Sequence, residues 1–101
     1  MDIQSHMQDE EFLARLSGRM MFSDNPAFRV LLDEARSSGA KRYVFDLSEL
    51  ASVDSAGLGM FLIAAEQAKK SGLPLTLRRP SGQVKQLLAL ARFDKLVAIQ
   101  E

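Results

Sequence analysis

Cysteine and tryptophan are absent from this 101-residue sequence, and the only histidine is His6. Without cysteine the chain has no disulfides, no thiol nucleophile and no thiolate ligands for zinc, which agrees with a reducing cytoplasm. One histidine in the polar start of the chain gives no basis for a serine–histidine–aspartate triad. We therefore expect no catalytic residues, no metal site and no cofactor, and we do not expect an enzyme.

An excess of either charge sign is also missing, because 13 lysines and arginines balance 13 aspartates and glutamates. A chain without net charge has little long-range attraction for a phosphate backbone, so nucleic acid is not an expected partner. No apolar run approaches the ~20 residues of a membrane-spanning helix, so we expect no direct membrane insertion. The start, Met1 to Glu11, is polar and acidic, unlike a signal peptide. These features predict a cytoplasmic protein.

The length of the chain fits one domain covering residues 1–101. Ser5, His6 and Met7 match a sequence left behind by cloning, in which case Met7 is the native start. Residues 1–10 are expected to be either poorly ordered or partly tag-derived, and both alternatives stay open. Only a weak strand pattern, at residues 3–7, falls within this segment.

Strand and helix patterns alternate along the rest of the chain. Strands are expected at 12–16, 43–47, 73–77 and 96–99, and helices at 26–38, 55–71 and 81–91. Asn25 is the expected cap of the first helix, with Pro26 at its first position. Residues 50–53 are expected to be a short connection. The alternation predicts an α/β fold, in which helices pack against a sheet.

The beginning of the long helix is the most informative part of the sequence, since Asp54 and Ser55 can each cap it. With Asp54 as the cap, Val53 and Leu58 occupy the two positions of a hydrophobic staple. With Ser55 as the cap, the paired positions fall on Asp54 and Gly59, and no staple forms. We therefore expect Asp54 to cap the helix and Ser55 to occupy its first position, with an exposed hydroxyl that a kinase can reach.

A phosphate on Ser55 is expected to leave the fold intact. It would meet unpaired N–H groups and the positive end of the helix dipole, which favour an anion by ~0.3–1 kcal/mol. The carboxylates of Asp54, Asp46 and Glu49 would oppose it by a similar amount. The modification would therefore act outside the domain, by adding ~1.5 to 2 negative charges to a docking surface.

Two further features of this helix have both a packing explanation and a partner-binding explanation, and the choice stays open. Gly57 and Gly59 each cost the helix roughly 0.5–1 kcal/mol, either to allow tight packing or to leave backbone bare for a partner. The expected core face consists of Leu58, Phe61, Leu62, Ala65 and Ala68. Other apolar residues lie elsewhere on the helix, as extra core or as partner surface: Met60, Ile63 and Ala64.

The stretch from Tyr43 to Leu62, and above all Asp54 to Gly59, resembles the signature of STAS domains, a family named after sulfate transporters and anti-sigma-factor antagonists. The similarity covers nearly the whole chain in element order, and Arg92 to Leu96 is similar to single-domain bacterial antagonists. The resemblance implies a single STAS-type domain with a mixed sheet of four to five strands, packed by about four α-helices.

The resemblance also implies a function. Ser55 would be phosphorylated by an anti-sigma factor that is itself a serine kinase. The unphosphorylated domain would sequester this partner and so regulate transcription, and a serine phosphatase would reset it. The expected partner-binding residues are Asp54, Ser55, Ala56, Gly57, Leu58, Gly59, Met60, Ile63 and Ala64. The alternative is a non-phosphorylated STAS subunit of a lipid-transport or other multiprotein complex, in which the same helix is a permanent interface.

Overall fold

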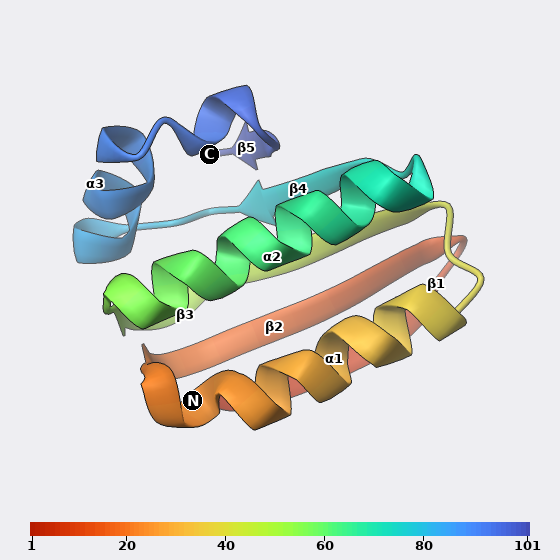
Figure 1. Ribbon diagram of the computed structural model, residues 1–101, viewed down its shortest axis with the longest axis horizontal. Helices are drawn as coiled ribbons and strands as arrows, with labels where there is room; N and C mark the ends of the chain where they lie inside the picture. The colour runs from red at the N-terminus through yellow and green to blue at the C-terminus, as the bar shows by residue number, and fades with distance from the viewer.

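Five β-strands form one mixed sheet whose spatial order, β1-β2-β3-β4-β5, is the order of the chain in the computed structural model of residues 1–101 (Figure 1). The strands are β1 (Asp2–Gln8), β2 (Glu11–Met20), β3 (Arg42–Val53), β4 (Leu75–Arg78) and β5 (Ala98–Gln100). β1 is antiparallel to β2, and the other three neighbouring pairs are parallel. This architecture confirms the predicted α/β fold with a mixed sheet.

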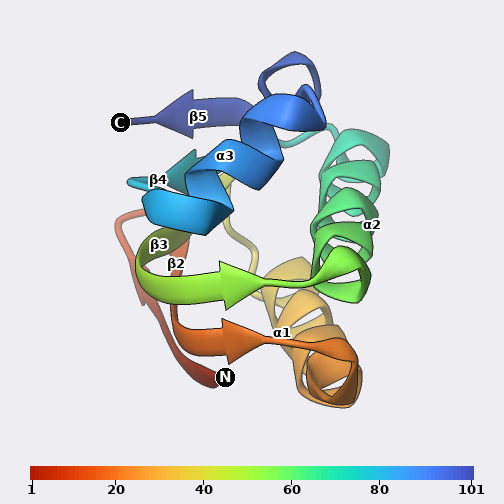
Figure 2. The same cartoon turned by 90° about the vertical axis from the view of Figure 1, so that its left-hand side faces the viewer.

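Three α-helices connect the parallel strands: α1 (Asn25–Ser37), α2 (Ser55–Ser71) and α3 (Gly82–Leu90). The expectation of about four α-helices is slightly too high, because two further helical segments are single 3-10 turns, η1 (Phe22–Asp24) and η2 (Phe93–Lys95). Figure 2 shows α1 and α2 on the same side of the sheet, with α3 near the end of β3. None of the helices has both the length and the apolar character that crossing a bilayer requires.

The start of α1 differs by one residue from the prediction, since its N-cap is Asp24 and not Asn25. η1 runs directly into the helix, so Asn25 already has helical geometry. The carboxylate of Asp24 turns back and accepts a hydrogen bond from the Met21 N–H at 2.8 Å. The end of α2 follows the prediction, because Gly72 adopts the left-handed conformation with φ 69° that stops a helix.

β2 and β3 are longer than the sequence patterns predict, and β3 continues beyond β4. The pairing of β2 with β3 extends to Met20 and Val53, with two irregularities in register on the way. The expected connection at residues 50–53 is therefore wrong: Leu50 and Val53 are buried, and both pair with β2. β4 pairs with β3 only as far as Asp46. Beyond Asp46, β3 has a neighbouring strand on one side only.

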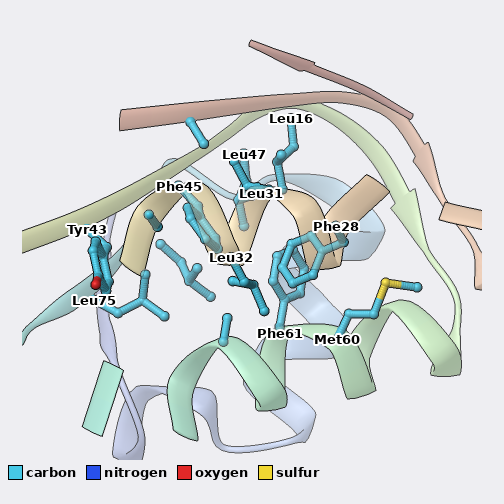
Figure 3. Packing of buried hydrophobic residues seen from close by; sticks show 14 of the residues in the cluster. Leu16, Phe28, Leu31, Leu32, Tyr43, Phe45, Leu47, Met60, Phe61 and Leu75 are labelled. Carbon is cyan, nitrogen blue, oxygen red and sulfur yellow. The ribbon is translucent and has the colours of Figure 1, made fainter. Parts of the chain in front are cut away.

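Three phenylalanines from three elements meet at the centre of the core (Figure 3). Phe28 of α1 packs edge to face against Phe45 of β3 and Phe61 of α2, with ring centroids 5.9 and 6.0 Å apart. Such aromatic pairs prefer this geometry, which makes their packing directional. The trio therefore helps to set the rotation of α2 against α1 and the sheet.

The rotation of α2 differs from the core face expected from its sequence. Leu62, expected in the core, is 42% exposed, whereas Met60 and Ala64 are 2% and 3% exposed. α2 packs against both the sheet and α1, so its buried arc is broad enough to include Met60 beside Phe61. Figure 3 shows these two side chains entering the same core from α2.

Candidate functional site

The first turn of α2 begins as the staple argument predicted, with Asp54 as the N-cap. The Asp54 backbone is extended, at φ −89° and ψ −177°, and its carboxylate accepts a hydrogen bond from the Gly57 N–H at 2.8 Å. Its carbonyl accepts the first helical hydrogen bond, from the Leu58 N–H at 3.0 Å. Ser55 is thus the first residue of the helix.

Ser55 lies on the surface, and its hydroxyl takes part in none of the side-chain hydrogen bonds of the structure. This follows from the cap, because Asp54 already satisfies the N–H that a capping serine at position 55 would need to reach. The result is an accessible hydroxyl beside the N-terminal end of a helix of 17 residues. A hydroxyl in this position can be reached by another protein without any opening of the fold.

Two neighbouring elements hold the backbone that leads into this turn. On one side, the Met20 carbonyl at the end of β2 accepts a hydrogen bond from the Asp54 N–H at 3.2 Å. On the other side, the side chain of Gln83 in α3 makes two hydrogen bonds to the Val53 backbone, at 3.0 and 2.9 Å. Sequence reasoning missed Gln83, because the gap it fills arises only from β3 extending past β4.

The two glycines of the first turns have different explanations. Gly57 is buried, and a Cβ added there would lie 2.7 Å from Val53 Cγ1 and 3.1 Å from the Met20 carbonyl oxygen. Tight packing of the helix on the ends of β2 and β3 therefore accounts for Gly57. A Cβ at Gly59 would meet nothing within 4 Å. Packing within the domain therefore does not account for Gly59.

The nine residues expected to bind a partner divide into an accessible and a buried group. Six are exposed or partly exposed: Asp54, Ser55, Ala56, Leu58, Gly59 and Ile63. Three are buried against the sheet or α1, which corrects the expectation that they contact a partner: Gly57, Met60 and Ala64. Spacing of four residues places Ser55, Gly59 and Ile63 along one line on the outer side of α2. We call these three residues the outer face of α2.

Asp46 is a buried carboxylate on the opposite side of the sheet from the aromatic core. It accepts hydrogen bonds from the Ser48 N–H and from the Arg79 guanidinium, both at 3.0 Å, and Arg15 lies 3.8 Å away. Burial by itself would raise the pKa of Asp46, but the Ser48 hydrogen bonds and the Arg79 hydrogen bond and charge outweigh it and lower the pKa below its ordinary value. The Asp46 charge is compensated locally, so this residue is a poor candidate to oppose a Ser55 phosphate.

Two surface grooves lie away from the first turn of α2. One, with a volume of about 710 Å³, lies between the second half of α2 and η2, and Leu62, Leu73 and Leu96 contribute to its walls. The other lies beside α3. No group of three or more histidine, aspartate or glutamate side chains is arranged to hold a metal ion. Ser55 lines neither of the two grooves.

Comparison with known proteins bears on the family of the chain. Residues 3–98 match the family described as "Mlab, STAS domain". A STAS-domain-containing protein of Pseudomonas aeruginosa strain UCBPP-PA14 is 29% identical over 90 residues, which make up 89% of this chain and 88% of that protein.

Solved structures with the same fold include bacterial regulators. An anti-sigma factor antagonist from Mycobacterium paratuberculosis superimposes with a TM-score of 0.86 at 17% identity, over 98% of this chain and 84% of that chain. The anti-sigma factor antagonist SpoIIAA gives a TM-score of 0.78 unphosphorylated, at 17% identity, over 99% of this chain and 88% of that chain. Phosphorylated SpoIIAA from Bacillus gives a TM-score of 0.76 at 16% identity, over 99% of this chain and 92% of that chain. At these identities the similarity establishes the fold alone, whereas the family match spans nearly the whole sequence. The chain belongs to the STAS domain family.

Proposed function

We propose that this domain is an anti-sigma-factor antagonist whose binding to its partner is switched by phosphorylation of Ser55. The observation that carries the proposal is the Ser55 hydroxyl, which is exposed and unbonded at the first position of a helix capped by the preceding residue. The partner would be an anti-sigma factor that is itself a serine kinase, and a serine phosphatase would restore the binding state. The setting would be the cytoplasm, and the domain itself would perform no catalysis.

Unphosphorylated, the domain would bind its partner through the outer face of α2. Gly59 leaves backbone uncovered next to Ser55, and Ile63 adds an apolar side chain that is 41% exposed. A partner can pack closely against such a surface because no side chain at Gly59 holds it away. The exposed Asp54, Ala56 and Leu58 would lie at the edge of this interface.

A phosphate on Ser55 would oppose binding through charge and desolvation. It adds ~1.5 to 2 negative charges to a surface that a partner has to dehydrate. Within the domain itself, the N-terminal end of α2 favours the phosphate, while the Asp54 carboxylate disfavours it, and each effect is ~0.3–1 kcal/mol. The fold would therefore stay intact while the interface is lost, which is what a switch requires.

Intact-mass measurement tests the proposal directly. The protein is incubated with ATP and a purified serine-kinase anti-sigma factor encoded near its gene, and Ser55→Ala is compared with Ser71→Ala, an exposed serine at the other end of α2. We expect one phosphate on the wild type and on Ser71→Ala, and none on Ser55→Ala. A phosphate that persists on Ser55→Ala would contradict the assignment.

A second candidate function is a permanent interface without phosphorylation, as in a STAS subunit of a lipid-transport or other complex. Leu62 and Ile63 favour it, since both are about two-fifths exposed and offer an apolar surface whatever the state of Ser55. Ser55→Asp separates the candidates. A switched antagonist would lose affinity for its partner by tenfold or more, whereas a permanent subunit would still co-purify with its complex.

A further inference from the structure

Val53, the last residue of β3, has a backbone edge that no strand covers. On the β2 side, β3 is paired up to Val53 and Met20. On the other side, pairing with β4 stops at Asp46. The N–H and C=O of Val53 both point towards this unpaired side, because the two main-chain groups of one strand residue point the same way and successive residues alternate between the two neighbours. Val53 itself is 3% exposed, so its polar backbone groups need partners from elsewhere.

The side-chain amide of Gln83 supplies both partners. Gln83 Oε1 accepts a hydrogen bond from the Val53 N–H at 3.0 Å, and Gln83 Nε2 donates one to the Val53 carbonyl at 2.9 Å. One amide group thus replaces the backbone of a missing strand. Only a side chain with both an acceptor and a donor, and with the length of glutamine, completes this pair. Glutamate lacks the donor and leucine lacks both groups.

This pair of hydrogen bonds lies immediately next to the turn that presents Ser55. The residue after Val53 is Asp54, whose N–H is bonded to the Met20 carbonyl and whose carboxylate is bonded to the Gly57 N–H. Gly57 in turn packs against the Val53 side chain so closely that there is no room for a Cβ. A movement of Val53 would therefore be transmitted through backbone, cap and packing to the first turn of α2.

We propose that Gln83 is a positioning residue for Ser55: by clamping the Val53 backbone from α3, it holds the first turn of α2 in the geometry that presents the hydroxyl. The presentation of Ser55 then depends on two neighbouring elements, with β2 holding Asp54 and α3 holding Val53. The inference has a structural part, that Gln83 holds the first turn of α2 in place, and a kinetic part, that this placement speeds phosphorylation. The kinetic part rests on the proposed phosphorylation of Ser55. The structural part does not.

Amide hydrogen exchange, measured residue by residue by NMR, tests the structural part. The variants are Gln83→Leu and Gln83→Glu, and the matched controls are Gln86→Leu and Gln86→Glu at an exposed position of the same helix. The Val53 N–H loses its partner in Gln83→Leu, and we expect its exchange to accelerate by about two- to tenfold for each hydrogen bond removed. If Gln83 positions the turn, the Asp54 and Gly57 amides accelerate as well.

Two outcomes would overturn the inference. In one, the Gln83 variants accelerate exchange at the Val53 amide alone; in the other, the Gln86 variants accelerate exchange as much as the Gln83 variants do. The first result would show a hydrogen bond without positioning, and the second would show a general effect of substitution in α3. Because this measurement needs no partner, it decides the structural part even if Ser55 proves not to be phosphorylated.

Phosphorylation kinetics test the kinetic part of the inference with the same variants. Gln83→Leu substitutes none of the residues on the outer face of α2, and Gly59 and Ile63 lie beyond the first turn, so we expect KM for the domain to stay within about twofold and kcat to fall several-fold. A merely structural role would lower the melting temperature and leave kcat at a temperature well below melting unchanged, and that result would contradict positioning. Absence of any phosphate on the wild type would refute the proposed function and leave the exchange result standing.

Discussion

Gly57 and Gly59 are two residues apart on α2, yet they lie in opposite environments. The position of a Cβ at Gly57 is already occupied by Val53 Cγ1 and the Met20 carbonyl, whereas Gly59 faces open space. Gly57→Ala is therefore expected to lower the free energy of unfolding by about 1–3 kcal/mol. Gly59→Ala is expected to raise it by about 0.5–1 kcal/mol, because alanine favours the helix. Urea denaturation of both variants measures the two changes.

Each glycine serves as the control for the other, since the chemical change is identical. If both variants were destabilised equally, the packing explanation for Gly57 would be wrong. Gly59→Ala also separates stability from binding. It adds a methyl group to the outer face of α2, so we expect weaker partner binding in a protein that is more stable.

At the scale of single residues, the role of a residue could be predicted from the sequence where that role depends on neighbours along the chain. Asp54 was correctly predicted as the cap because Val53 and Leu58 stand at staple positions within the same segment. Gln83 could not be found this way. Its partner Val53 lies 30 residues away, and the need for a clamp arises only from the relative lengths of β3 and β4.

At the scale of the element, α2 depends on its cap. Asp54→Ala removes the carboxylate that accepts from the Gly57 N–H and is expected to lower the free energy of unfolding by about 0.5–2 kcal/mol. Asp54→Asn keeps a side-chain acceptor, so we expect it to retain most of this stability. Thermal unfolding followed by circular dichroism compares the two variants. Equal losses in both would indicate that the charge, and not the cap, is what stabilises the helix.

The sequence predicted the existence of α2 and both of its ends, but not its rotation. Leu62 and Met60 are both apolar, and the pattern of the helix alone cannot decide which of them is buried. The decision comes from α1, whose Phe28 packs on Phe61 and makes α2 a helix with two buried sides. The extension of β3 to Val53 was missed for a similar reason, because Leu50 and Val53 are spaced irregularly and become buried only through the register shifts with β2.

At the scale of the whole molecule, Asp46 makes stability depend on pH. Its pKa is lowered in the folded protein, so the ionised form stabilises the fold. This contribution is fully present above the ordinary aspartate pKa of 3.8 and is lost as the pH falls below it, through the lower folded-state pKa. The free energy of unfolding should therefore decline below about pH 4. Asp46→Asn should be less stable at pH 7 by about 1–2 kcal/mol and decline less steeply.

Urea denaturation between pH 2 and 7 measures this difference, with Asp33→Asn as the control. The Asp33 side chain is 66% exposed and pairs with Arg36 on the surface of α1, where such pairs contribute little. We expect its pH profile to follow that of the wild type. A profile of Asp46→Asn parallel to the wild type would show that Asp46 is not the group that titrates.

The strand order of the sheet has a consequence for the assembly of the protein during synthesis. Each new strand adds to the edge that the preceding strand has just formed, so the growing chain never has to insert a late strand between two early ones. The part through β3 and α2 can begin to pack while the ribosome is still adding the part from β4 to β5. Gln83 belongs to that last part. The turn that carries Ser55 therefore gains its contact with Gln83 only after α3 has been added, and the proposed recognition of Ser55 by a kinase would wait until most of the domain has been made.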